Sequence, residues 1–236
     1  MIWQLIVILM VGYLIGSVNL SIVLSKLMGK GDIREHGSGN AGTTNTLRVL
    51  GKGPAVLVLT FDICKAVIAI LVAKGIFAIS GVTELVTVGG ALLQNTTYEI
   101  GILLAALGAI LGHNFPIYYG FKGGKGIATS LGALLMIEWQ IGLVCLIFAL
   151  TLMISSRMVS LGSICAAILY PVLVFIMGDA FGTSAEAKLA YIIFAICIAG
   201  LAVFRHRANI KRLLNGTENK LWKTKAEKAE ENKKTE

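Results

Sequence analysis

The sequence predicts an all-α integral membrane protein with about seven transmembrane helices, some of them short, and with its motif loops on the cytoplasmic face. Of its 236 residues, 56% are hydrophobic and only 14% are charged, and the mean hydropathy is +0.80. These values lie far above those of soluble globular domains. Apolar segments of helix length recur along the chain, and basic residues gather between alternate segments. No polar stretch is long enough to build a separate soluble domain.

The spans are expected where about 20 mainly apolar residues follow one another, because this length crosses the hydrocarbon core. The first segment lacks the basic start and the cleavage site of a signal peptide, so it is the first span. "EWQ" at 138–140 divides a long apolar region into two short helices joined by a tight outer turn, and "QNTTYE" at 94–99 leaves the third span poorly bounded. The apolar segments are 2–24, 54–72, one that ends at Leu111, 127–154, 161–177 and 189–204.

The basic residues predict the sidedness, because cytoplasmic loops collect Lys and Arg while acids are nearly indifferent. With seven spans, the segments 25–53, 113–126, 155–160 and 205–236 share one side and hold 18 of the 21 basic residues. The N-terminus is therefore expected outside and the C-terminus in the cytoplasm. The outer turns and interface receive the acidic and tryptophan side chains Glu84, Glu99, Glu138, Asp179, Glu186, Trp3 and Trp139.

A single polytopic membrane domain, 1–204, is expected, followed by a juxtamembrane cytoplasmic motif, 205–220, and a charged solvated tail, 221–236. Asp62 and Lys65 lie three residues apart inside the second span. An intramembrane ion pair is costly, so the two are predicted to be partners with a functional role. All four cysteines fall in apolar segments without metal-like spacing and are expected to be buried free thiols: Cys64, Cys145, Cys165 and Cys197.

The first polar motif, "HGSGNAGTTNTLR" at 36–48, combines glycines with hydroxyl and amide donors and ends at Arg48. Glycine amides at positions 37, 39 and 42 leave room for an anion, and an arginine can close such a cage with a bidentate fork. The GxxxxGK[ST] spacing of a Walker A loop is absent. A flexible turn beside the membrane is the alternative, but the density of donors favours phosphate binding.

The second motif, "GHNFPIYYGFKGGKGIATS" at 112–130, places Lys122 and Lys125 on a glycine-rich loop before an apolar helix, whose first amides favour an anion. Topological anchoring would need the lysines but not the glycines. "RHRANIKRLLNGTENK" at 205–220 puts His206, Asn209 and Arg212 on one helical face, which suits either lipid headgroups or a site. Because His36, His113 and His206 each border a different cytoplasmic segment, a shared site is favoured.

In this order and between apolar spans, "GSGNAGTTNTLR", "GHNFPIYYGFKGGKGIAT", "RMVSLGS" and "RHRANIKRLLNGTE" closely resemble the bacterial acyl-phosphate:glycerol-3-phosphate acyltransferase family. The likeness runs through nearly the whole chain up to Glu218. It implies a seven-helix enzyme of the bacterial inner membrane that acylates the 1-hydroxyl of glycerol 3-phosphate from an acyl phosphate. The products are lysophosphatidic acid and phosphate, in the first acylation of phospholipid synthesis.

The resemblance also implies the site residues and partners. Ser38, Gly39 and Asn40 are assigned to the anhydride phosphate and the reacting carbonyl. Glycerol phosphate is assigned to the surrounding side chains Arg48, Lys125, Ser160, His206 and Asn209, with Lys122 and Lys65 as second choices. Ser38, His206 and Asn209 are the expected catalytic residues. The expected partners are acyl phosphate, glycerol 3-phosphate and the bilayer, and no nucleic acid is expected. Because an acyl phosphate is already activated, no cofactor or metal is expected either.

Two other classes of function fit part of this pattern. A transporter of small organic phosphates would suit short helices and intramembrane charges, but transporters bind at the midplane and usually contain internal repeats, whereas the donors here cluster on one face. A scaffold that binds anionic lipid would explain the basic tail alone. The HxxxxD pattern of acyl-CoA-dependent glycerol phosphate acyltransferases is absent after each histidine.

Overall fold

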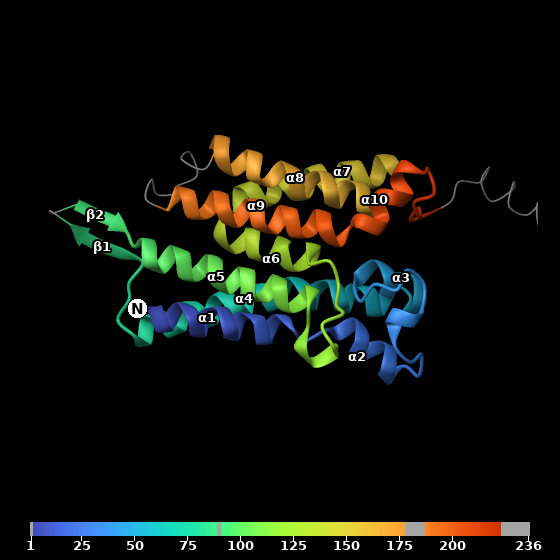
Figure 1. Ribbon diagram of the computed structural model, residues 1–236, viewed down its shortest axis with the longest axis horizontal. Coiled ribbons are helices and arrows are strands. Elements are labelled where there is room, and N and C mark those ends of the chain that lie inside the picture. The colour runs from blue at the N-terminus through green and yellow to red at the C-terminus, as the bar shows by residue number, and fades with distance from the viewer. Residues whose placement is uncertain (1, 89–90, 178–186, 223–236) are drawn as a thin grey trace, which may run out of the picture.

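The computed structural model describes residues 2–88, 91–177 and 187–222. The protein is an elongated bundle whose long helices lie side by side along one axis (Figure 1). The elements in chain order are α1 (Ile2–Gly16), α2 (Leu20–Leu27), the 3-10 turn η1 (Ile33–Glu35), α3 (Thr43–Leu50), α4 (Lys52–Ile79), β1 (Leu85–Val88), β2 (Ala91–Gln94), α5 (Thr96–Asn114), the 3-10 turn η2 (Ile117–Tyr119), α6 (Ile127–Ile137), α7 (Trp139–Ser156), α8 (Val159–Met177), α9 (Lys188–Arg205) and α10 (Arg207–Leu214).

The predicted number of spans is confirmed. Within the described residues, six helical segments are long and apolar enough to cross a membrane, and α6, with 11 residues, is a shorter apolar helix. The six segments are Ile2–Leu27, Lys52–Ile79, Thr96–Tyr119, Trp139–Ser156, Val159–Met177 and Lys188–Arg205.

The third span begins at the polar run that left it poorly bounded in the sequence. Asn95 is the N-cap of α5, and its side-chain oxygen accepts hydrogen bonds from the amides of Thr97 and Tyr98 at 3.1 and 3.4 Å. This satisfies donors that a helix start leaves free. The preceding residues pair as the antiparallel hairpin β1–β2. "QNTTYE" therefore starts the helix rather than interrupting it.

The predicted break at "EWQ" is also confirmed, because α6 ends at Ile137 and α7 begins at Trp139. The two acidic side chains expected in the outer turns at these positions are not solvated, however. Glu99 is 6% exposed and Glu138 is 4% exposed, and the Tyr170 hydroxyl donates to Glu138 Oε2 at 3.1 Å. The turn places Glu138 between helices that pack over it. Asp179 and Glu186 lie outside the described residues, as does most of the predicted tail.

Close packing of α1 on α5 holds the first half of the chain together. A Cβ atom on Gly16 would lie 2.1 Å from the Ala109 oxygen, and one on Gly112 would lie 2.2 Å from the Tyr13 oxygen. No side chain fits at these positions, so the two backbones approach directly, as small residues allow between membrane helices. The contact brings the end of α1 beside the end of α5, and with them the first two motifs.

The predicted ion pair inside the second span is confirmed. Lys65 Nζ lies 2.8 Å from Asp62 Oδ1, and the two side chains are 1% and 3% exposed. The cluster has a third member, because His113 Nδ1 on α5 lies 2.6 Å from Lys65 Nζ and 3.2 Å from Asp62 Oδ1. Charged side chains in a membrane are stabilised by such mutual contacts. The cluster joins α4 to α5 close to the second motif.

All four thiols are free, but the prediction that they are buried holds only for Cys145. Cys165 is partly buried, and Cys64 and Cys197 are exposed on the outside of α4 and α9. A thiol is compatible with lipid as well as with a protein core, so an apolar sequence context does not distinguish the two surroundings.

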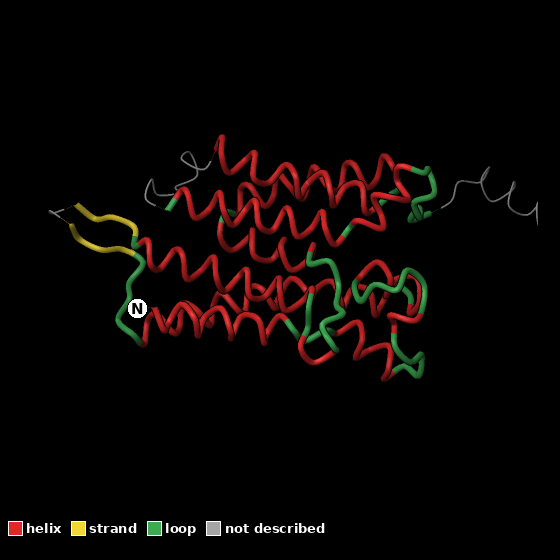
Figure 2. The backbone as a smooth tube through the Cα atoms, in the orientation of Figure 1, coloured by secondary structure: helices red, strands yellow, loops and turns green. Residues whose placement is uncertain are grey.

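The three glycine-rich or basic motifs gather at one end of the bundle. The loops before α3, after α5 and after α10 lie at this end, whereas the N-terminus and the β1–β2 hairpin lie at the opposite end (Figure 2). Each of these motifs follows an odd number of spans, so each lies at the end opposite to the N-terminus. We call it the motif end.

Candidate functional site

The first motif folds around Asn45, the second residue after Thr43 in α3. Its buried side chain accepts from the Ser38 amide at 2.8 Å and donates to the carbonyls of Ile33 and His36 at 3.1 and 2.9 Å. Its side-chain oxygen and its side-chain nitrogen are thus both used in hydrogen bonds within the protein. Asn45, one of the amide side chains of the motif predicted to bind phosphate, therefore shapes the loop.

Two of the three glycine amides expected in the anion cage donate hydrogen bonds inside the loop instead. The Gly39 amide donates to the His36 carbonyl and the Gly42 amide to the Asn40 carbonyl, both at 3.1 Å. Gly37 and Gly39 have φ angles of +60° and +70°, so their lack of a side chain serves the turn itself. The side chains of Ser38 and Asn40 are left to face a cavity.

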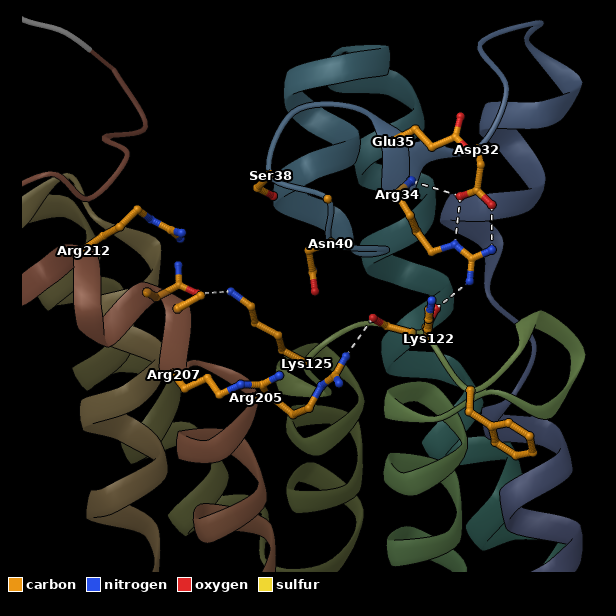
Figure 3. A pocket seen from close by; sticks show the side chains of 15 residues that line it. Asp32, Arg34, Glu35, Ser38, Asn40, Lys122, Lys125, Arg205, Arg207 and Arg212 are labelled. Carbon is orange, nitrogen blue, oxygen red and sulfur yellow. Dashed lines mark hydrogen bonds and ion pairs between the residues drawn. The ribbon is translucent and has the colours of Figure 1, made fainter.

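Arg34, from η1, connects the first motif to the second. Its Nε and Nη2 donate to Asp32 at 2.9 and 2.6 Å, while Nη1 donates to the carbonyls of Tyr119 and Lys122 at 2.7 and 3.0 Å. The fork geometry of the guanidinium makes these simultaneous contacts possible. Arg34 thereby fixes one side of the glycine-rich loop (Figure 3).

Arg205, at the end of α9, fixes the other side of that loop. It donates from Nε to the Gly124 carbonyl and from Nη2 to the Gly123 carbonyl, each at 3.0 Å, and it stacks 5.2 Å from the centre of the Phe115 ring. A Cβ atom on Gly123 or Gly124 would lie 2.1 or 2.0 Å from His113. The glycines thus let the loop lie directly on His113, which confirms that backbone geometry matters here.

Lys125 is the side chain that the loop presents. Its ammonium donates to the Asn209 side-chain oxygen on α10. Burial lowers the pKa of Lys125 to about 8; Glu218 opposes this shift, while the guanidinium groups of Arg212, Arg48 and Arg205 add to it. Figure 3 shows Lys125 between the loop of Ser38 and Asn40 and the helices that carry Arg205 and Arg212.

Glu218 organises the third wall of the site. Its Oε1 accepts from Ser160 Oγ at 2.9 Å and from Asn209 Nδ2 at 2.7 Å, and its Oε2 accepts from Arg212 Nε at 2.8 Å. Burial would raise the pKa of this carboxyl, but the hydrogen bonds from Asn209, Ser160 and Arg212 outweigh it and lower the pKa. The carboxylate therefore fixes α8 and α10 to each other as a permanent negative charge.

His206 lies between α9 and α10 and is 3% exposed. Its Nδ1 lies 2.7 Å from the Ala202 carbonyl, which can only accept, so Nδ1 carries the hydrogen and Nε2 holds a lone pair. Burial, assisted by the charge of Lys125, lowers the pKa of His206 to about 4. The imidazole is neutral at physiological pH and can accept a hydrogen bond.

Two cavities meet at the motif end. The cationic cavity has a volume of about 600 Å³ and is lined by the charged side chains Arg34, Lys122, Lys125, Arg205, Arg207, Arg212, Asp32 and Glu35. The apolar cavity, of about 590 Å³, runs from His206 and Glu218 down between α6, α7, α8 and α9. Four residues line both: Ser38, Asn40, Lys125 and Asn209.

Nine of the ten site residues chosen from the sequence line these cavities. Gly39 and Lys122 line the cationic cavity and Arg48, Ser160 and His206 line the apolar one, in addition to the four shared residues. Lys65 lines neither, because its ammonium is engaged by Asp62 and His113. The prediction that the three histidines share one site is wrong for His36. Its side chain is exposed and lines neither cavity.

The sequence did not single out Glu218, Arg34 or Arg205 as site residues. Glu218 stands 58 residues from Ser160, and Arg34 stands 88 residues from Lys122. The one signal in the sequence was that each lies within or beside a polar motif. Their partners are set by tertiary contacts that residue spacing does not reveal.

Comparisons with known proteins agree with the arrangement of these motifs. A family model described as glycerol-3-phosphate acyltransferase matches residues 6–216. The glycerol-3-phosphate acyltransferase of Shouchella clausii is 44% identical over 226 residues, 96% of this chain and 100% of that protein. That of Halalkalibacterium halodurans is 45% identical over 215 residues, 90% of this chain and 93% of that protein.

Solved structures show the same fold. The glycerol 3-phosphate form of PlsY (YgiH), an integral membrane glycerol 3-phosphate acyltransferase, is 34% identical with a TM-score of 0.74. Its lysophosphatidic acid form is 33% identical with a TM-score of 0.71. Each comparison covers 92% of this chain and 94% of the other.

Glu218 should be needed for activity, because it holds Ser160, Asn209 and Arg212 in place. Glu218→Gln removes the charge that holds Arg212 and replaces one acceptor oxygen by a donor, so we expect kcat/KM to fall about 10- to 100-fold, as for loss of one hydrogen bond to a charged group. Glu84→Gln, an exposed carboxylate at the opposite end of the bundle, is the matched control. Equal activity of the two variants would show that Glu218 does not organise the site.

Proposed function

Because the chain belongs to the glycerol-3-phosphate acyltransferase family, we propose that its acyl donor is an acyl phosphate and that the four residues shared by the two cavities surround the reacting atoms. The single observation that carries this proposal is the meeting of a cationic cavity with an apolar one at Ser38, Asn40, Lys125 and Asn209. An acyl phosphate has one end for each cavity, with its carbonyl carbon between them.

The phosphate of the donor fits the cationic cavity beside Ser38, Gly39 and Asn40, while its acyl chain fits the apolar cavity. The beginning of α6 at Gly126 faces the same junction and has no side-chain cap, so its free amides favour developing negative charge. Glycerol 3-phosphate then lies near Arg48 and Ser160 at the polar mouth of the apolar cavity.

In the proposed reaction the 1-hydroxyl oxygen attacks the carbonyl carbon, and the bond from that carbon to the phosphate oxygen breaks. The departing phosphate keeps the electron pair. Burial and the charge of Lys125 lower the pKa of His206, which disfavours its protonated form, so we assign its Nε2 to orienting the hydroxyl and the departing phosphate to receiving the proton. Holding both reactants in place supplies much of the acceleration, because effective molarities of about 10⁵ M or more are attainable.

The guanidinium of Arg48 suits the second phosphate, because no protein group within the described residues forms a hydrogen bond or ion pair with it. A transporter of organic phosphates is not favoured, since the polar donors gather at one end of the bundle rather than at mid-depth. We also propose that residues 1–204 form the membrane domain, 205–220 the juxtamembrane motif and 221–236 a solvated tail.

The donor is tested directly with purified protein in detergent. We expect palmitoyl phosphate and glycerol 3-phosphate to yield lysophosphatidic acid and one phosphate per turnover, while palmitoyl-CoA yields neither. Ser38→Ala serves as a low-activity reference. Sustained acylation from palmitoyl-CoA alone would overturn the proposed donor without affecting the family.

The motif end is proposed to face the cytoplasm of a bacterial cell, with the N-terminus outside. In a cysteine-free background, we expect single cysteines at Lys30 and Lys211 to react only after the inner face is opened to an impermeant maleimide. A cysteine at Thr83, exposed at the opposite end, should react in intact cells. Labelling of all three from the same side would contradict the seven-span arrangement.

Arg48→Lys separates charge from fork recognition. If Arg48 holds a phosphate through two parallel N–H bonds, lysine keeps the charge but loses one bond. Such a loss costs about 1.5 to 3 kcal/mol, so kcat/KM for glycerol 3-phosphate should fall roughly 10- to 100-fold. Lys211→Arg, exposed on α10, should change it by less than about twofold. If steady-state kinetics give the two variants equal values of kcat/KM, Arg48 does not bind the phosphate.

The lowered pKa of Lys125 gives a pH dependence. The ammonium is charged below about pH 8 and neutral above it, and only the charged form attracts phosphate. We therefore expect kcat/KM to decline as the pH rises through about 8, because this quantity reports groups of the free enzyme. Lys125→Arg, which stays charged, should abolish that decline; an unchanged profile in this variant would assign the titration to another group.

A further inference from the structure

The lining of the apolar cavity reaches no farther along α8 than Tyr170, which is hydrogen-bonded to Glu138, and the proposed reaction uses neither side chain. Tyr170 on α8 lines the cavity and is 2% exposed, and its hydroxyl donates to Glu138 Oε2 at 3.1 Å. Leu134, Cys145 and Ile198 line the same region and are each 6% exposed. The deepest lining residues on these four helices are therefore buried side chains.

The depth of these lining residues follows from the helices that form the walls. Tyr170 is ten residues beyond Ser160 on α8, which corresponds to about 15 Å along a helix. Ile198 is eight residues before His206 on α9, or about 12 Å. Both walls place these residues about halfway across a hydrocarbon core of roughly 30 Å. An acyl chain that enters from the junction meets Tyr170 before it reaches the other face.

A carboxyl group and a phenol at this depth are costly unless their polar atoms are satisfied, and such residues usually serve a function. Glu138 holds the tyrosine at the break between α6 and α7, where a helix end allows its side chain to turn inward. An apolar side chain could have filled the space. The hydrogen bond instead fixes the ring in one orientation, which a rigid stop requires.

We propose that Tyr170, held by Glu138, is the stop that limits the length of the acyl chain this enzyme accepts. The inference rests on the proposed acyl phosphate donor and deepens it by naming the side chain that selects among donors. Chains that end before the tyrosine gain about fourfold in binding for each buried methylene. Longer chains must displace the ring or leave the cavity, so their kcat/KM falls.

The test measures kcat/KM for lauroyl, myristoyl, palmitoyl and stearoyl phosphate. In Tyr170→Ala we expect the preferred chain to lengthen, with the ratio of stearoyl to myristoyl phosphate rising at least about fivefold over the wild type. Tyr170→Phe keeps the ring but loses the hydrogen bond to Glu138, so its ratio should lie between those of the wild type and Tyr170→Ala. Ala166→Leu, which fills the cavity about one turn nearer the junction, should shift the preference to shorter chains.

Tyr191→Ala is the matched control, because Tyr191 is 9% exposed on the neighbouring α9 but lines neither cavity. Its chain-length profile should equal that of the wild type. If Tyr170→Ala does not fold, Tyr170→Phe still tests the stop, because it removes the hydrogen bond to Glu138 and keeps the ring. A wild-type profile in both would overturn the stop and show that the chain leaves the cavity for the bilayer. A wild type that releases no phosphate from any donor would instead overturn the proposed function.

Discussion

His113 connects the interior of the membrane domain to the loop that carries Lys125, and the geometry of the site depends on it. On one side its Nδ1 meets the buried pair of Lys65 and Asp62 at 2.6 and 3.2 Å. On the other, its backbone carbonyl accepts from the Gly124 amide at 3.1 Å and its ring leaves no room for a side chain there. A loop that rests on a group fixed in the core has little freedom to shift its lysine.

The arginines around the cationic cavity divide into those that build it and those that remain for a ligand. Arg34 is paired with Asp32 and with loop carbonyls, Arg205 holds two glycine carbonyls, and Arg212 is paired with Glu218. Arg34 and Arg205 use several of their N–H donors in these contacts, and the charge of Arg212 is offset by that of Glu218, so net charge alone overstates what the cavity offers a phosphate. Lys122 and Lys125, on a loop held from both sides, are better placed for binding. Pre-organised donors of this kind avoid reorganisation cost during the reaction.

Much of the fold could be predicted from the sequence because membrane spans and charge asymmetry are local or additive signals. The span count, the break at Glu138 and the contact of Asp62 with Lys65 all follow from spacing along one helix or from hydropathy. The site was predicted only in outline. Asn45 and the amides of Gly39 and Gly42 belong to a motif predicted to bind an anion, yet they form hydrogen bonds inside the loop.

The role of Glu218 could not be predicted, since its partners come from α8 and α10 and only the folded chain brings these together. The burial of Glu99 and Glu138 was missed for a related reason. A turn at the end of an apolar segment is normally solvated, and only the packing of neighbouring helices shows that these two are enclosed. Residue type and spacing identify a side chain's chemistry, whereas its partners depend on contacts distant in sequence.

The proposed reaction joins two molecules from different surroundings, and this explains why the site lies where helices end. A phosphate needs donors and positive charge, which spanning helices supply only at their termini, while an acyl chain needs the apolar space between them. Ser38, Asn40, Lys125 and Asn209 stand where both conditions hold. The product, lysophosphatidic acid, has a phosphate-bearing end and an acyl chain, as the donor does. It can therefore bind at the junction in the same orientation. Binding energy from the chain is then similar before and after transfer, and the difference that drives catalysis must come from the polar groups.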